Sequence, residues 1–358
     1  MIKTPFAAGM SRRAFLGGAA GLGSGMLAGC GGRAAAGAGS VATSQSAAAL
    51  GGFDAEAAWT RPGGSGTIET LAWRPGQQQF ASGSSAGQIR LWSSAGTVQQ
   101  SSQFAGFVSG LSWSPDGARL AVATTQGAVL LWPDAGAWPA RFATAINRYA
   151  AVAWRPDSAV LAVADGATSV TLWRPTGTPG PALAMVGQST ALAWSPDGSL
   201  LAGGNRAGSV TIWTANSGVR WTFAGANHHD VNSLAWSPDG RILAAGYEDG
   251  TVALLAAATG RSQGSLPVGR PVNAVAWSPN GAVLAVSSLR LSVTLWSTSP
   301  PAPLTELPVG YDVNDILWSP TGDLLLAGAD DHALHAWSVQ PAQGPGSPLL
   351  SATGYMAR

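Results

Sequence analysis

Four histidines and the carboxylates beside them are the side chains of this 358-residue sequence that could support acid–base or metal chemistry. They form two groups: His228-His229-Asp230, and Asp330-Asp331-His332 with His335. Residues three apart on a strand point to opposite faces, so His332 and His335 are poorly placed to share a metal ion. Zinc-protease, nucleophile-elbow, phosphate-loop and calcium-loop motifs do not occur. We therefore expect exposed loop histidines, no metal, no cofactor and no enzymatic activity.

The single cysteine offers a different chemistry, as a site of lipidation. Cys30 follows Leu27-Ala28-Gly29, which resembles a bacterial lipobox, in which the thiol accepts a diacylglyceryl (palmitate-type) lipid. Upstream, Arg12 and Arg13 precede a Gly-rich, weakly apolar run, a pattern similar to a twin-arginine (Tat) export signal. That run is shorter than the roughly 20 residues that span a bilayer. These resemblances imply that residues 1–29 are a signal peptide and that Cys30 begins the mature chain.

Residues 30–52 form a predicted tether between this lipid and the rest of the chain. Beyond Cys30 they are almost entirely Gly, Ala, Ser, Thr and Gln, which cannot pack a core. A flexible segment of this length has an r.m.s. reach of about 25 Å. We expect a protein on the extracytoplasmic face of a bacterial cell membrane, held there by lipid alone. Because Gly31 stands where a retention-type Asp could follow the cysteine, outer-membrane sorting stays open in a two-membrane cell.

Composition predicts a large folded core and argues against nucleic acid as a partner. Apolar residues make up 46% of the chain and charged residues 10%, which excludes a disordered protein. Lys3, Arg12 and Arg13 lie in the signal segment, so the 19 basic residues fall to 16 beyond it, against 18 acidic ones. A nearly neutral chain whose one lysine is Lys3 is a poor binder of phosphate backbones.

One unit of about 41 residues recurs seven times between residue 53 and the end of the chain, each copy marked by an apolar-small-Trp-Ser/Arg-Pro motif. Its tryptophans are Trp73, Trp113, Trp154, Trp194, Trp236, Trp277 and Trp318. Nineteen residues after each of these comes a second apolar signature: Trp92, Trp132, Trp173, Trp213, Leu255, Trp296 and Trp337. Thirteen of the 16 tryptophans occupy these two positions, so we expect them to form the core.

Each unit has the pattern of short strands joined by tight turns. In the fourth copy, 191–194, 200–203 and 210–213 are predicted strands, with a Ser-Pro-Asp-Gly turn after the first. Proline two residues after each first tryptophan ends strand pairing, and Asp-Gly supplies turn geometry. The aspartates of these turns are therefore expected to be structural.

The 41-residue period and the strands that end in Leu-Trp resemble WD-repeat β-propellers. The resemblance covers residues 53–358 and implies an all-β, seven-bladed propeller with four antiparallel strands per blade. The Trp-Asp dipeptide of the family occurs in no repeat, and the turn aspartate that would anchor its polar network remains only at Asp249 and Asp331. Apolar packing should therefore dominate between blades.

Closing the ring requires a strand from one end of the chain to complete the last blade. Trp59, Trp138 and Trp221 lie 14 to 16 residues before the next first-position tryptophan, where outer strands are expected. Residues 55–62 thus form an outer strand with no blade before it, which could complete blade seven. A strand around Leu349–Thr353 is the alternative.

The resemblance implies a monomeric scaffold for protein–protein interaction. The regular spacing of the repeats leaves no room for an inserted lid over the ring. Three alternatives remain open: a propeller hydrolase or lyase, a ligand-sensing lipoprotein with a site at the channel mouth, and a structural component of the envelope.

Loops that enter the first strands, and turns between second and third strands, share one face in such propellers. The residues expected there as protein-binding positions are Glu69, Arg148, Asp230, Asn232, Glu248, Asp249, Asn273, Asp312, Asn314, Asp330 and Asp331. Acidic residues concentrate in blades five to seven. Either these polar residues keep the face soluble, or they form a recognition patch for a basic partner segment.

Overall fold

The structure is a computed structural model. It describes residues 53–126, 128–133, 141–143, 151–164, 168–215, 218–225, 229–289 and 291–341. The predicted signal peptide, the predicted lipidation site Cys30, the predicted tether and the alternative closing strand near residue 350 lie outside the described residues. Arg148, Trp138 and His228 do so as well.

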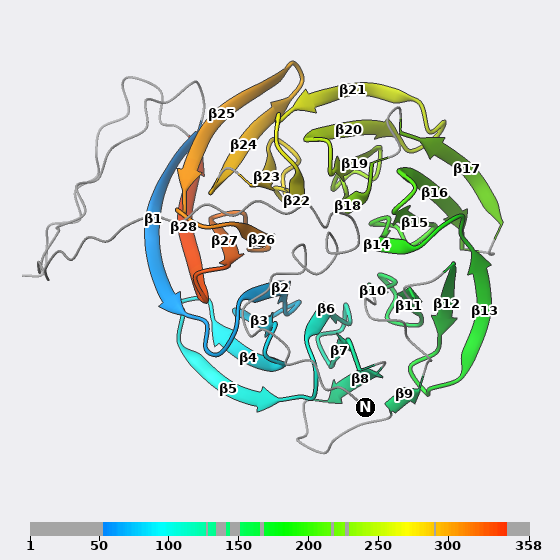
Figure 1. Ribbon diagram of the computed structural model, residues 1–358, viewed down its shortest axis with the longest axis horizontal. Coiled ribbons are helices and arrows are strands. Elements are labelled where there is room, and N and C mark those ends of the chain that lie inside the picture. Colours follow the sequence, from blue (N-terminus) through cyan, green and yellow to red (C-terminus); the bar gives the residue numbers. More distant parts are fainter. Residues whose placement is uncertain are drawn as a thin grey trace, which may run out of the picture.

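The described chain is all-β, and its strands lie in four-stranded antiparallel sheets arranged as the blades of a propeller (Figure 1). Over the described residues these sheets number seven. Blades one to six each take four consecutive strands, from β2–β5 to β22–β25, and blade seven takes β26, β27, β28 and β1.

Within each blade the first strand lies innermost and the fourth outermost (Figure 1). The first strands are β2 (Ile68–Trp73), β6 (Val108–Trp113), β10 (Val152–Trp154), β14 (Ser189–Trp194), β18 (Val231–Trp236), β22 (Val272–Trp277) and β26 (Val313–Trp318). The second strands are β3 (Gln79–Ser84), β7 (Arg119–Thr124), β11 (Leu161–Ala164), β15 (Leu200–Asn205), β19 (Ile242–Tyr247), β23 (Leu284–Ser288) and β27 (Leu324–Ala329).

The outer half of each blade is built in the same way. The third strands are β4 (Gln88–Ser93), β8 (Ala128–Pro133), β12 (Ser169–Trp173), β16 (Ser209–Thr214), β20 (Thr251–Ala256), β24 (Ser292–Thr298) and β28 (Ala333–Pro341). The fourth strands are β5 (Val98–Gln103), β9 (Arg141–Ala143), β13 (Pro179–Ala184), β17 (Val219–Ala224), β21 (Ser262–Pro267), β25 (Pro301–Pro308) and β1 (Phe53–Pro62).

The N-terminal strand closes the ring, which confirms the first of the two closures considered from the sequence. β1 pairs antiparallel with β28, from Phe53 opposite Pro341 to Pro62 opposite Ala333. Trp59 lies in β1 and Trp221 in β17, both outer strands as expected. β1 pairs along the edge of β28 that would otherwise be unpaired, and it thereby completes blade seven as a four-stranded sheet.

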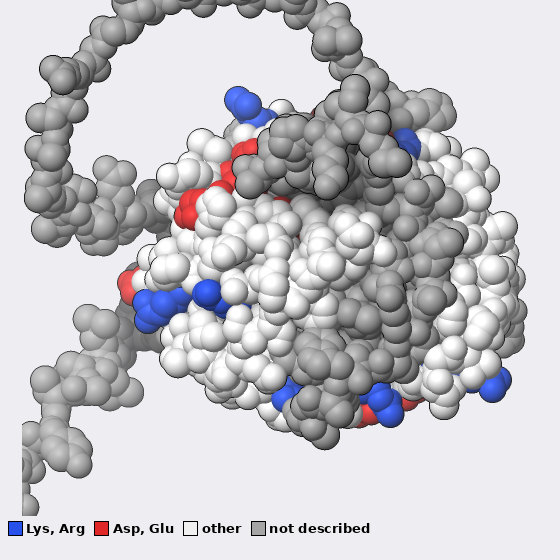
Figure 2. All heavy atoms as spheres, turned by 60° about the horizontal axis from the view of Figure 1, so that its bottom comes forward, with Lys and Arg blue, Asp and Glu red and all other residues white. Residues whose placement is uncertain are grey.

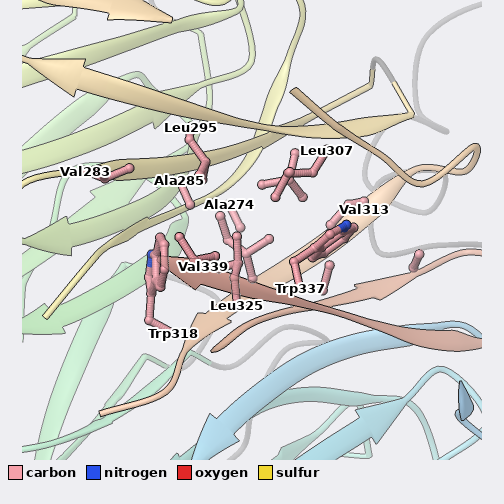
Figure 3. Packing of buried hydrophobic residues seen from close by; sticks show 14 residues of the cluster. Ala274, Val283, Ala285, Leu295, Leu307, Val313, Trp318, Leu325, Trp337 and Val339 are labelled. Carbon is pink, nitrogen blue, oxygen red and sulfur yellow. The ribbon is translucent and has the colours of Figure 1, made fainter. Parts of the chain in front are cut away.

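The hydrophobic core lies between blades, and each buried apolar cluster among the described residues spans two neighbouring ones. The cluster between blades six and seven brings Val283, Ala285 and Leu295 against Trp318 and Trp337 (Figure 3). All seven first-position tryptophans are buried, as are the described second-position side chains. Second strands such as Leu324–Ala329 are apolar throughout because both faces of a blade are covered.

The ring has two rims, one at each end of its strands. The lower rim carries the turns after each first-position tryptophan, and the upper rim carries the loops into the first strands and the turns between second and third strands. On the lower rim, Ser195 Oγ donates to Asp197 Oδ1 (2.6 Å) and accepts from Leu200 N (2.9 Å). Ser237 and Asp239 repeat the first of these bonds. The structural role predicted for the turn aspartates is confirmed.

Candidate functional site

The upper rim of blade five combines carboxylates and cations at half-buried positions. Asp230 lies in the loop that enters β18, and Arg206, in the turn that follows β15 of blade four, approaches it at 3.8 Å between Nε and Oδ2. Asn232 donates from Nδ2 to Glu248 Oε2 (2.9 Å). Burial raises the pKa of Asp230 above its ordinary value, and Glu248 acts in the same direction, against the attraction of Arg206.

Blade seven repeats this arrangement with aspartates. Asn314 donates from Nδ2 to Asp330 Oδ1 (2.8 Å), and the backbone N–H of Asp330 donates to the carbonyl oxygen of Asp312 (2.9 Å). Burial raises the pKa of Asp330, and the carboxylates of Asp312 and Asp331 add to this effect, against the hydrogen bond from Asn314. The geometry thus gathers three aspartates on one stretch of the rim.

The asparagines expected on this rim also bind the neighbouring blade. Asn232 Nδ2 donates to Val272 O (2.9 Å), Asn273 Nδ2 to Val313 O (2.9 Å), and Asn314 Nδ2 to Ile68 O (3.0 Å). In each pair the acceptor opens the first strand of the next blade. These amides therefore hold blades five, six, seven and one in register, whatever else they contact.

Glu69 occupies the corresponding position of blade one, but its side chain is only 1% exposed. Its Oε1 accepts a short hydrogen bond from Thr67 Oγ1. Glu69 is thus a buried residue of β2 and adds nothing to the exposed surface of the rim. Unlike the asparagine amide, the carboxylate of Glu69 has no N–H group to donate to a carbonyl oxygen of the next blade, so it accepts a hydrogen bond from the Thr67 hydroxyl instead.

The two turn aspartates that match the family pattern make different contacts. Asp331 Oδ2 lies 2.9 Å from His335 Nε2, and its Oδ1 accepts from Ala333 N (3.0 Å). Asp249 Oδ1 accepts from both the backbone N–H (3.0 Å) and the hydroxyl (2.7 Å) of Thr251. Both aspartates are therefore committed to turn geometry, and Asp331 also to β28.

Figure 2 shows that most of the described surface in view carries no charged side chain, and that acidic and basic ones lie mainly toward its periphery, with acidic atoms at the upper left, the left edge and the lower edge. Among the described residues, no group of three or more His, Cys, Asp or Glu side chains is arranged to hold a metal ion. No helix within the same residues has the length and hydropathy to cross a bilayer.

The sequence correctly placed Asp230, Glu248, Asp312 and Asp330 at upper-rim loops and turns, but the prediction that Glu69 is exposed there was wrong, and the bonds between blades were missed. A usable signal was present, because the residue four positions before the first tryptophan is asparagine in three successive blades. A second omission is Arg74, whose guanidinium lies over the Trp113 ring at 4.7 Å and whose Nε donates to Gly117 O (2.9 Å).

Comparison with known families gives two matches, both to WD40 sequences. The family described as "WD domain, G-beta repeat" matches residues 58–93, 97–133 and 303–338. The family described as "Anaphase-promoting complex subunit 4 WD40 domain" matches residues 192–280. No curated protein matches the sequence significantly. Each of the three repeat matches begins on an outer strand and ends on the third strand of the following blade.

Proposed function

We propose that this chain, a β-propeller built from WD40 repeats, is a lipid-anchored extracytoplasmic scaffold that binds a basic protein partner on its upper rim. WD40 propellers are typically non-enzymatic platforms for protein–protein interaction. The observation that carries the proposal is the grouping of Asp230, Glu248, Asp312 and Asp330 on one rim of a closed ring. Complementary charge on such a rim would mainly accelerate encounter with the partner.

The placement of β1 supports an anchor on the opposite side of the ring. Residue 62 pairs with residue 333 beside the upper-rim turn, whereas residue 53 pairs with residue 341 at the far end of β28. Nine paired residues at about 3.3 Å each separate the two ends by roughly 30 Å. A tether that leads into residue 53 would therefore reach the lower rim, and the acidic upper rim would face away from the membrane.

The anchor is tested by cell fractionation. Replacing the lipid acceptor, Cys30→Ala, should release the protein into the soluble extracytoplasmic fraction, because no other thiol can be lipidated. Replacing Arg12 and Arg13 with lysines should retain it in the cytoplasm. Persistent membrane association of the Cys30→Ala protein would contradict the anchor.

Partner binding is tested by association kinetics. Once a partner is captured from membranes by affinity purification, the double variant Asp230→Asn/Asp312→Asn should slow its association and flatten the salt dependence. Thermal stability should change little. An association rate equal to wild type at low and high salt would exclude the acidic rim as the docking site.

A further inference from the structure

The turn between the second and third strands of a blade contains one residue in the left-handed backbone region. In blades one, four and five this residue is glycine, with φ of 80° at Gly87, 77° at Gly208 and 85° at Gly250. In blades six and seven the same position holds Leu291 and His332, each with φ of 63°. Left-handed geometry is unfavourable for residues that carry a Cβ atom, so these two positions store strain.

The left-handed geometry itself has a structural cause. The carbonyl oxygen at this position accepts a hydrogen bond from the loop that leads to the next blade: Phe104 N to Gly87 O (2.8 Å), Gly225 N to Gly208 O (2.9 Å), Gly269 N to Gly250 O (2.9 Å), Gly310 N to Leu291 O (2.8 Å) and Gly63 N to His332 O (2.6 Å). The bond accompanies the left-handed conformation at Leu291 and His332, and it does not require a side chain there, since glycine supports the same bond at lower cost.

Both strained side chains point to an exposed surface rather than a core. Leu291 is 46% exposed, His332 is exposed, and Tyr311 between them in the rim is 52% exposed. In blades one and five the space is closed, because a Cβ on Gly87 or Gly250 would lie 2.4 or 2.5 Å from backbone atoms of the loop. Blades six and seven thus carry exposed side chains at a position where blades one and five have glycine.

These residues form a continuous strip along the upper rim. The carbonyl oxygen of Leu291 accepts a hydrogen bond from Gly310 N, and Tyr311 and Asp312 follow Gly310 in the chain. The carbonyl oxygen of Asp312 accepts from Asp330 N, and His332 lies in the same turn as Asp330. We call Leu291, Tyr311, Asp312, Asp330 and His332 the rim strip. Together with the neighbouring Asp331, the described residues of this stretch carry three carboxylates.

We propose that the rim strip binds a segment of a partner protein in which an apolar side chain stands beside an arginine or lysine. The apolar side chain would pack on Leu291 and Tyr311, and the cation would face Asp312 and Asp330. Tyrosine is enriched in protein–protein interfaces, whose apolar centre is surrounded by a polar rim. This inference rests on the scaffold function proposed above and adds where the partner sits and what it presents.

The test pans a library of random 12-residue peptides, displayed on phage, against the immobilised full-length chain. Enriched peptides should combine an apolar residue with a neighbouring Arg or Lys. Their affinity should fall about tenfold or more in Leu291→Gly and in Tyr311→Ser. Leu291→Gly should at the same time raise the melting temperature by about 1–3 °C, because glycine relieves the strained backbone.

Ser158→Gly is the matched control. Ser158 has φ of 59° on the lower rim, where its Oγ accepts from Asp116 N (3.1 Å), so its replacement should leave peptide affinity unchanged. Enriched peptides without a basic residue, no enrichment, or full affinity in both strip variants would overturn the inference. So would dimerisation of the chain that is lost in Leu291→Gly, since a second copy would then be the occupant.

The result also separates this inference from the scaffold function. Peptides that keep affinity for the strip variants but lose it in Asp230→Asn would leave the acidic rim as the docking site and refute the strip. Failure of both the peptide selection and the capture of any partner on the upper rim would count against the proposed function as well.

Discussion

The indole Nε1 of Trp277 donates a 3.2 Å hydrogen bond to the carbonyl oxygen of Ala235 in the preceding blade. The same bond joins Trp194 to Ala153, Trp236 to Ala193 and Trp318 to Ala276. These four tryptophans therefore fill the space between blades and also bond across it, whereas Trp73 donates to Gln77 O in its own blade. Their side chains tie the lower part of adjacent first strands, while the asparagines of blades five to seven tie the upper part.

Replacing one of these tryptophans should separate its two contributions. We expect Trp277→Ala to destabilise the fold by about 3–5 kcal/mol, through the cavity and the lost bond. Trp277→Phe keeps most of the apolar volume and should cost less, with about 1 kcal/mol of its effect from the lost bond. Chemical denaturation measures both, and an unchanged unfolding midpoint in Trp277→Ala would show that the core assignment is wrong.

The asparagine bonds can be tested with a substitution that the chain itself uses. Asn273→Ala removes the donor to Val313 O and should lower the free energy of unfolding by about 1–2 kcal/mol. In blade four, Thr190 makes the equivalent bond with its hydroxyl to Val231 O. Asn273→Thr should therefore keep most of the stability that Asn273→Ala loses. Equal losses in both variants would argue that the amide packs rather than bonds.

Acid should unfold the propeller through its lower-rim turns. Hydrogen bonds, chiefly from Ser114, Ser195 and Ser237, hold the pKa values of Asp116, Asp197 and Asp239 below their usual range. A carboxyl group with a lowered pKa contributes stability above its unfolded pKa of about 4, and this contribution is lost as pH falls through the folded pKa. We therefore expect the urea midpoint to drop below about pH 4.

The upper rim should oppose this trend at milder pH. Asp230 and Asp330 have raised pKa values, so folding disfavours their ionised forms and protonation relieves that cost as pH falls toward 4.

The control for the lower-rim turns is Asp197→Asn, since Asn280 accepts the corresponding backbone N–H in blade six. This variant should lose part of the acid sensitivity, and an unaltered pH profile would contradict the assignment to the turns.

Ring closure by β1 predicts a difference between the two ends of the chain. Deleting residues 53–62 removes the pairing with β28 and exposes its edge, so the truncated protein should unfold or aggregate. Deleting residues 345–358 should leave the melting temperature close to that of the full chain. The opposite pattern would show that the C-terminal segment completes the ring in solution.

The repeating architecture could be predicted from the sequence because its signals are apolar and periodic. Tryptophans 19 residues apart and a proline after each first one fix where strands lie and end, and the structure confirms their burial. The closing strand was also predictable, since Trp59 matches Trp221 in its distance to the next motif.

Polar residues at the same repeat position were harder to interpret, because the repeat position does not determine whether their partner lies in the same blade or in the next one. Glu69 and Asn273 stand four residues before a first-position tryptophan, yet one is buried beside Thr67 and the other bonds to Val313. The left-handed backbone of Leu291 and His332 gave no signal in the sequence beyond the absence of a glycine. In both residues the left-handed backbone accompanies a carbonyl hydrogen bond to a loop about 20 residues later or at the other end of the chain.

Site-specific photo-crosslinking measures whether a partner binds to the upper rim. A photoreactive residue would replace exposed Arg270, in the loop beside the blade-five turn, or exposed Arg241 on the lower rim, and adducts would be identified by mass spectrometry. We expect one partner to be crosslinked from position 270 and not from position 241, with the yield reduced by Asp230→Asn/Asp312→Asn. Adducts from position 241 alone, or equal yields that the double variant leaves unchanged, would contradict it.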